Sequence, residues 1–128
     1  MKIINTKNAP APVGPYNQAI LTSGELLFVS GQIPLDPFTG EIVGPEDIVK
    51  QTIQVMKNLE AILNSADLGW QNVVKTSVFL TDLNNFTAMN QVYAQYFQAE
   101  TSPARACVQV SRLPKDVLVE IDCIAVKF

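Results

Sequence analysis

Only two segments of this 128-residue chain show the spacing of apolar residues that is typical of helices, and this limits its possible folds. In the first segment apolar residues recur every three or four positions from Ile48 to Ala66. Pro45 suits its first turn, Glu46 favours its positive N-terminal end, and Gly69 marks its exit. The second follows N-cap candidates at residues 82–85 and has an aromatic-rich stripe of Phe86, Met89, Tyr93, Tyr96 and Phe97.

The remaining apolar runs are short and rich in β-branched residues, which predicts strands. They cover residues 18–21, 26–30, 73–80, 104–110 and 117–126, with a further short strand at residues 3–4. Residues 23–25 read as a hairpin turn between the first two runs, and residues 31–44 as a surface loop. The predicted order is ββαβαββ, an α+β fold with a mixed sheet. Two helices of this length cover only one face of such a sheet.

The uncovered face of the sheet needs a partner. It is expected to carry Ile124 and Val126 beside Glu120 and Asp122, a mixture better suited to a subunit interface than to bulk water. We therefore expect a closed homo-oligomer.

Near the C-terminus, polar side chains alternate with apolar ones on two predicted strands. Arg105 and Cys107 share one face of their strand, and Glu120 and Asp122 share one face of the next. A hairpin around residues 114–116 brings the polar faces together when the apolar faces coincide. We expect Arg105 and Cys107 to look toward Glu120 and Asp122, with the register open between these two acids.

Composition excludes several classes of protein. The length and 48% hydrophobic content fit a single domain spanning residues 1–128, and a net charge of −3 without a basic run gives no footprint for nucleic acid. The absence of histidine removes triad hydrolases and histidine-ligated zinc sites. No glycine-rich phosphate loop supports a nucleotide cofactor. Without a membrane span or a signal peptide, the chain is expected to be cytoplasmic.

Each candidate site residue has a functional and a structural interpretation. The planar guanidinium of Arg105 suits a carboxylate, but the pattern alone favours an internal ion pair with Glu120 or Asp122, because structural ion pairs are common. Glu120 either positions a water molecule or serves as that counter-ion. Cys107 lacks a histidine to activate it, which favours a role in packing.

Two further residues are candidates for a site, and their sequence context leaves the choice open. Asn90 stands inside the aromatic stripe, where an unsatisfied amide is costly, so it requires a protein or ligand partner. Tyr16 follows the rigid Gly14-Pro15 entry and either lines a pocket or packs as an ordinary tyrosine.

Four motifs together resemble the Rid (YjgF-type) family of reactive-intermediate deaminases, and its RidA-like branch in particular. They are Gly-Pro-Tyr-Asn-Gln-Ala at residues 14–19, Phe-Val-Ser-Gly-Gln-Ile-Pro at 28–34, Val-Lys-Thr-Ser-Val-Phe-Leu at 74–80, and Pro-Ala-Arg-Ala-Cys at 103–107 with Val-Glu-Ile at 119–121. The resemblance implies a chorismate-mutase-like subunit. It also implies a homotrimer whose sheets form a central barrel, with clefts between subunits.

The resemblance implies hydrolysis of 2-imino and 2-enamino acids, such as 2-aminoacrylate and 2-aminocrotonate, to 2-keto acids and ammonia. No metal or other cofactor is implied. Arg105 would hold the substrate carboxylate and Glu120 would orient the attacking water. Main-chain groups around Gly31 and Cys107 would contact the imine, and the cleft would be lined by Tyr16, Ser30, Phe86 and Asn90.

Two other functions remain open on the sequence alone. The same arginine would serve a non-catalytic module that binds a small carboxylate, for example a 2-keto acid sensor. A ribonuclease-type translation inhibitor is a weaker alternative, because the chain has neither a basic patch nor a histidine.

Overall fold

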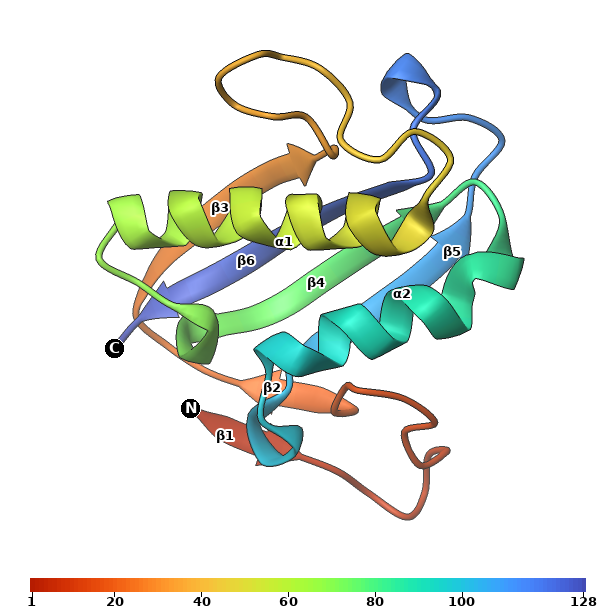
Figure 1. Cartoon of the computed structure of the whole chain (residues 1–128). Coiled ribbons are helices and arrows are strands. Elements are labelled where there is room, and N and C mark those ends of the chain that lie inside the picture. Colours follow the sequence, from red (N-terminus) through yellow and green to blue (C-terminus); the bar gives the residue numbers. More distant parts are fainter.

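The computed structural model describes all residues 1–128 and has two layers, a sheet with two helices on one face (Figure 1). The predicted α+β class and element order are confirmed. The elements are β1 (Lys2–Ile4), β2 (Ala19–Leu21), β3 (Glu25–Gln32), α1 (Ile48–Ser65), β4 (Val73–Leu80), α2 (Phe86–Tyr93), β5 (Ala104–Gln109) and β6 (Val119–Lys127). None of the helices has the length and hydrophobicity that crossing a membrane requires.

The strand order in the main sheet is β3-β6-β4-β5, and this corrects the predicted hairpin between β5 and β6. β6 is antiparallel to both β3 and β4, whereas β5 is parallel to β4. The connection through α2 is a crossover that returns the chain beside β4 in the same direction. Residues 110–118 then lead to the far side of β4, so β4 separates β5 from β6.

The first two predicted strands also do not pair with each other. β2 pairs with β1 in a separate two-stranded sheet, with Ile3 opposite Ile20, and β3 joins the main sheet instead. The glycine at residue 24 therefore lies in a link between two sheets. Its φ is 137°, and a Cβ added to it would lie only 2.8 Å from Val126 Cγ1, so both its conformation and its surroundings require glycine.

The first helix begins later than the sequence predicts. Asp47 is its N-cap, and the carboxylate accepts a hydrogen bond from the Lys50 amide at 3.0 Å. Gly44 and Glu46 have left-handed φ values of 66° and 60°, so the chain is still turning at these positions and Pro45 lies outside the helix. The helix ends at Ser65, with Ala66 as its C-cap.

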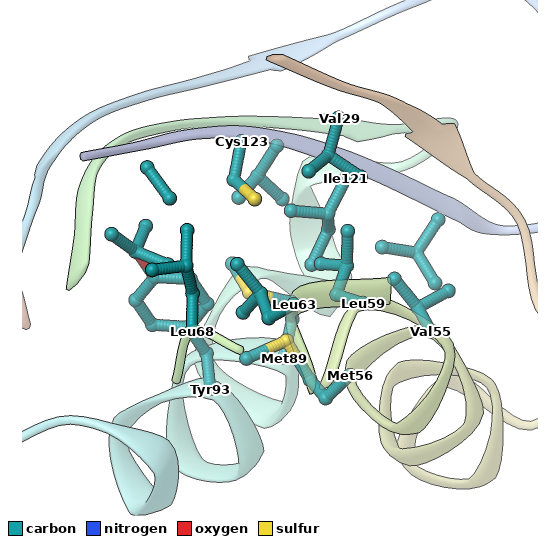
Figure 2. Packing of buried hydrophobic residues seen from close by; sticks show 14 of the residues in the cluster. Val29, Val55, Met56, Leu59, Leu63, Leu68, Met89, Tyr93, Ile121 and Cys123 are labelled. Atoms are coloured by element: carbon teal, nitrogen blue, oxygen red, sulfur yellow. The ribbon is translucent and has the colours of Figure 1, made fainter. Parts of the chain in front are cut away.

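The core lies between the two helices and the covered face of the sheet (Figure 2). Val55, Met56, Leu59 and Leu63 of α1 are fully buried and pack with Ile121 and Cys123 of β6. Met89 and Tyr93 extend the same cluster from α2. Cys123 is therefore a core residue, as the sequence pattern predicts, and burial raises the pKa of its thiol to about 12.

The opposite face of the sheet is not covered by any element of the chain (Figure 1). Leu26, Phe28 and Val108 are 53%, 68% and 47% exposed there, which is unusual for apolar side chains of one sheet. Ile124 is half-buried on this face as expected, but Val126 is fully buried because the turn at Gly24 packs against it. The structure thus presents an apolar surface on the face that the sequence leaves uncovered.

The packing predicts that Leu59→Ala lowers the free energy of unfolding by about 2–5 kcal/mol, because it opens a cavity beneath β6. Val49→Ala is the matched control on the same helix, because Val49 is 42% exposed, and its effect should stay within about 0.5 kcal/mol. Urea unfolding followed by circular dichroism measures both changes. Equal losses in the two variants would contradict this description of the core.

Candidate functional site

Arg105 lies on the helix-facing side of β5 and points into a cluster of aromatic rings. Its register partner on β4 is Thr76, which is buried beneath α2, so the arginine shares that side of the sheet. The guanidinium carbon is 4.9 Å from the ring centre of Tyr93, 5.5 Å from that of Tyr16 and 5.6 Å from that of Phe86. These distances fall within the range of cation–π contacts.

Asn90 supplies the polar contact of this arginine. Arg105 Nη1 donates to Asn90 Oδ1 at 2.6 Å, a short hydrogen bond from a charged donor. Asn90 stands one turn after Phe86 and one turn before Tyr93 on α2, so the helix presents two rings and an amide to the guanidinium. The partner that the sequence requires for this amide is therefore Arg105.

No carboxylate of the chain pairs with Arg105. The only ion pair in the structure joins Arg112 to Asp116, and both side chains are largely exposed. Neither Glu120 nor Asp122 forms an ion pair with Arg105, so the internal ion-pair interpretation is wrong. A half-buried guanidinium with one amide partner retains donors directed at no acceptor in the chain.

Glu120 lies on the other face of the sheet. It is opposite Phe79 in the β4–β6 register, and Phe79 is three residues from Thr76, the register partner of Arg105. An odd separation along a strand places side chains on opposite faces. The expectation that Arg105 and Cys107 look toward Glu120 and Asp122 is therefore wrong within one chain.

Gly31 and Glu120 form a second polar group on that open face. A Cβ added at Gly31 would lie 2.8 Å from both Cδ and Oε2 of Glu120, so the absent side chain leaves room for the carboxylate. A β-bulge between Val29 and Gln32 lies at this point of β3, and Ser30 within it is exposed. The bulge thus brings the main chain of β3 against the glutamate.

The predicted site residues therefore form two groups rather than one. Tyr16, Phe86, Asn90 and Cys107 accompany Arg105, whereas Ser30 and Gly31 accompany Glu120. Two hollows lie near these groups, but neither is lined by Arg105 or Glu120. One of about 140 Å³ is lined by residues including Gly14 and Tyr16, and one of about 320 Å³, between β3 and α1, by residues including Gly31 and Asn58.

Cys107 follows Arg105 by two residues on the same face and packs against the core. Burial raises the pKa of its thiol, and the nearby Arg105 opposes this effect only in part. The thiol is thus protonated at neutral pH, as a packing residue requires. No group of three or more His, Cys, Asp or Glu side chains is placed to hold a metal ion.

Sequence reasoning missed two residues of the arginine group, Thr76 and Tyr93. The sequence pattern places Tyr93 only in the apolar stripe of its helix, but its ring is the one nearest to Arg105. Its hydroxyl lies 2.7 Å from Thr76 Oγ1. The tyrosine hydroxyl would have allowed this prediction. A buried tyrosine needs a hydrogen-bond partner for its hydroxyl, and Thr76 lies in a predicted buried strand.

Comparison with known proteins identifies the family. Residues 6–127 match the family model described as Endoribonuclease L-PSP. A "RutC family protein" of Synechocystis is 61% identical over 98% of this chain and 96% of its own length. The Escherichia coli protein named "Putative reactive intermediate deaminase TdcF" is 48% identical over 98% and 97% of the two chains. The chain belongs to the Rid family.

Solved structures of Rid proteins share its fold. Escherichia coli TdcF with bound serine has a TM-score of 0.75 at 46% identity and covers the whole of both chains. RidA from an Antarctic Psychrobacter has a TM-score of 0.76 at 41% identity, covering 99% of this chain and 100% of that one. These structures confirm the predicted α+β fold of the subunit, with two helices on one face of a mixed sheet.

The contact between Gly31 and Glu120 predicts that Gly31→Ala displaces the Glu120 carboxylate while changing the free energy of unfolding by less than about 1 kcal/mol. The flexible end of a glutamate moves aside more easily than backbone does. Gly40→Ala is the contrasting control, because its φ of 71° is strained for alanine although no atom lies within 4 Å of the new Cβ. It should lose about 1 kcal/mol and leave Glu120 in place. Crystal structures and urea unfolding test both; an unmoved glutamate in Gly31→Ala would contradict the contact.

Proposed function

We propose that this Rid protein hydrolyses 2-imino and 2-enamino acids to 2-keto acids and ammonia. The observation that carries the proposal is the unpaired Arg105 guanidinium, held by Asn90 among three aromatic rings with no carboxylate of its own chain. Such a group is suited to a planar anion from outside. The names of reactive intermediate deaminases among its relatives support the same interpretation.

The chemistry needs few groups. An imine carbon is already electrophilic, so holding the substrate and placing one water molecule contribute much of the required rate. Arg105 binds the carboxylate with two parallel hydrogen bonds, and Glu120 orients the water that adds to the carbon. The carbon–nitrogen bond then breaks, nitrogen leaves as ammonia, and the oxygen of water becomes the keto oxygen. Main-chain groups around Gly31 and Cys107 contact the imine.

The site is proposed to be complete only between two copies of the chain in a homotrimer. Arg105 and Glu120 lie on opposite faces of one sheet, and the face of Glu120 also carries exposed Phe28 and Leu26. Burying that apolar face against a neighbour brings the Glu120 of one subunit toward the Arg105 of the next. In a cleft between two subunits, one substrate could then contact the Arg105 of one subunit and the Glu120 of its neighbour.

Two alternatives have different support. A module that binds a small carboxylate without turnover uses the same Arg105, and the serine bound to Escherichia coli TdcF fits either function, because serine has a carboxylate beside an amino group. The family description as an endoribonuclease has less support from this chain. Its net charge of −3 and lack of histidine provide neither phosphate contacts nor the usual general base.

Arg105→Ala is expected to lower kcat/KM for 2-aminocrotonate by roughly 100-fold or more, because the carboxylate loses its anchor. Arg105→Lys keeps the charge but not the planar fork, and should restore only a small part of the rate. The substrate is generated in situ from threonine by a dehydratase, and 2-ketobutyrate formation is followed with and without the protein.

Arg112→Ala is the control for this experiment, because it removes an arginine whose ion pair is exposed. It should keep wild-type activity. The thermal stability of Arg105→Ala should change little, because the variant removes a half-buried cation without a counter-ion but also the hydrogen-bond partner of Asn90. Wild-type rates in Arg105→Ala would refute its role, and binding of 2-ketobutyrate without any turnover would favour the non-catalytic module.

Mixed oligomers test the shared site. Arg105→Ala and Glu120→Gln are each expected to be inactive while remaining folded, and Glu120→Gln should still bind 2-ketobutyrate. Coexpression with two affinity tags gives mixed trimers in which one of three interfaces contains both an intact Arg105 and an intact Glu120. Their activity should return to roughly one third of wild type per trimer.

The opposite arrangement gives a different result. If both groups acted from one chain, no mixed oligomer would contain an intact site, and activity would stay at the level of the single variants. Unfolding of Glu120→Gln would instead assign the glutamate to stability. Light scattering of the wild type provides the independent check on the trimer.

A further inference from the structure

Tyr93 makes the closest aromatic contact of Arg105 and is held differently from the other two rings. Its centroid is 4.9 Å from the guanidinium carbon, against 5.5 Å for Tyr16 and 5.6 Å for Phe86. Tyr93 is fully buried and lies in the core cluster (Figure 2). The rings of Tyr16 and Phe86 are partly exposed. The guanidinium therefore rests on the one ring that the core fixes.

The hydroxyl of Tyr93 closes a loop of contacts back to the strand next to Arg105. It lies 2.7 Å from Thr76 Oγ1, and both side chains have no exposed surface. Thr76 is also the residue opposite Arg105 in the parallel β4–β5 register. Main-chain pairing thus joins Arg105 to Thr76, a hydroxyl pair joins Thr76 to Tyr93, and the Tyr93 ring lies beneath the guanidinium of Arg105.

A second contact from the same helix fixes the guanidinium at its other side. Asn90 precedes Tyr93 by three residues on α2 and accepts from Arg105 Nη1 at 2.6 Å. An aromatic face alone permits the guanidinium to slide, and one hydrogen bond alone permits it to rotate. The two together leave a single orientation, provided that the ring does not move.

Packing alone does not account for the hydroxyl pair. Phenylalanine in place of Tyr93 and valine in place of Thr76 would keep almost the same shape and would bury no hydroxyl. A buried hydroxyl is costly unless it has a hydrogen-bond partner. Burial raises the pKa of Tyr93 to about 12, so the pair stays neutral at every working pH. A neutral, fully buried hydrogen bond serves to fix an orientation.

We propose that Thr76 and Tyr93 are positioning residues, whose hydroxyl pair holds the Tyr93 ring so that the Arg105 guanidinium presents its fork to the substrate carboxylate. The proposal rests on the proposed function of Arg105. According to this proposal, loss of the hydroxyl pair lowers the affinity for carboxylates, in addition to any change in the free energy of unfolding. It also predicts that a flat two-oxygen anion depends on the pair more than a spherical anion such as chloride does, because only the former needs an aligned fork.

The test compares Thr76→Val, Tyr93→Phe and the double variant, with 2-ketobutyrate as the probe in calorimetric titrations. Each single variant leaves one buried hydroxyl without a partner, so it should lose both stability and affinity. The double variant removes both hydroxyls and should regain most of the stability. Its dissociation constant should nevertheless stay raised by roughly threefold to tenfold, because the ring is no longer held.

Two further variants separate positioning from folding. Thr76→Ser retains the hydroxyl and should retain wild-type affinity. Thr52→Val removes a buried hydroxyl of α1 that bonds only to the Ile48 carbonyl, so it should affect stability alone. The chemical shift of the Arg105 Nε–H proton gives an independent readout, because it reports how the guanidinium lies over the ring, and it should move in the double variant.

The outcomes distinguish the positioning role from the function beneath it. Binding of 2-ketobutyrate that is lost in Arg105→Ala but unchanged in the double variant overturns the positioning role and leaves the proposed function standing. Recovery of both stability and affinity in the double variant also overturns it. If the wild type binds no 2-ketobutyrate, or binds it independently of Arg105, the proposed function fails and the positioning role fails with it.

Discussion

The parallel pairing of β4 with β5 is the constraint on which the candidate site depends. It sets Arg105 opposite the buried Thr76 and therefore turns the charged side chain toward α2. The helix receives it with two aromatic rings and the amide of Asn90 instead of a carboxylate. A cation placed in this way is costly to the isolated chain and becomes favourable when an anion joins it.

The same sheet divides the polar groups between its two faces. Glu120 faces away from the helices. The carboxylate that the proposed reaction needs therefore lies on the same face of the sheet as the exposed apolar side chains. Oligomerisation and catalysis are then coupled in the proposal, since covering that face is what brings a glutamate to an arginine. Substitutions of Leu26 or Phe28 would act on both.

Local patterns in the sequence are sufficient to predict the elements and their faces, but not the order of the strands. Alternation places Arg105 with Cys107, and Glu120 apart from Cys123, as the structure has them. Alternation does not specify which strand lies next to which, and the short link at residues 110–118 suggests a hairpin although it passes across the end of β4. The requirement of Asn90 for a partner is predictable, whereas the identity of that partner depends on the β4–β5 pairing.

The proposed reaction draws on position more than on reactive side chains. The chain has no histidine, burial keeps the Cys107 thiol protonated, and the hydroxyl of Tyr93 is committed to Thr76. None of these groups is a nucleophile or base at neutral pH, which leaves Arg105, Glu120 and main-chain groups. An imine requires little more, because water attacks it readily once both are held in place. The precision with which Arg105 is held is therefore expected to govern the rate more than the pKa of any single group.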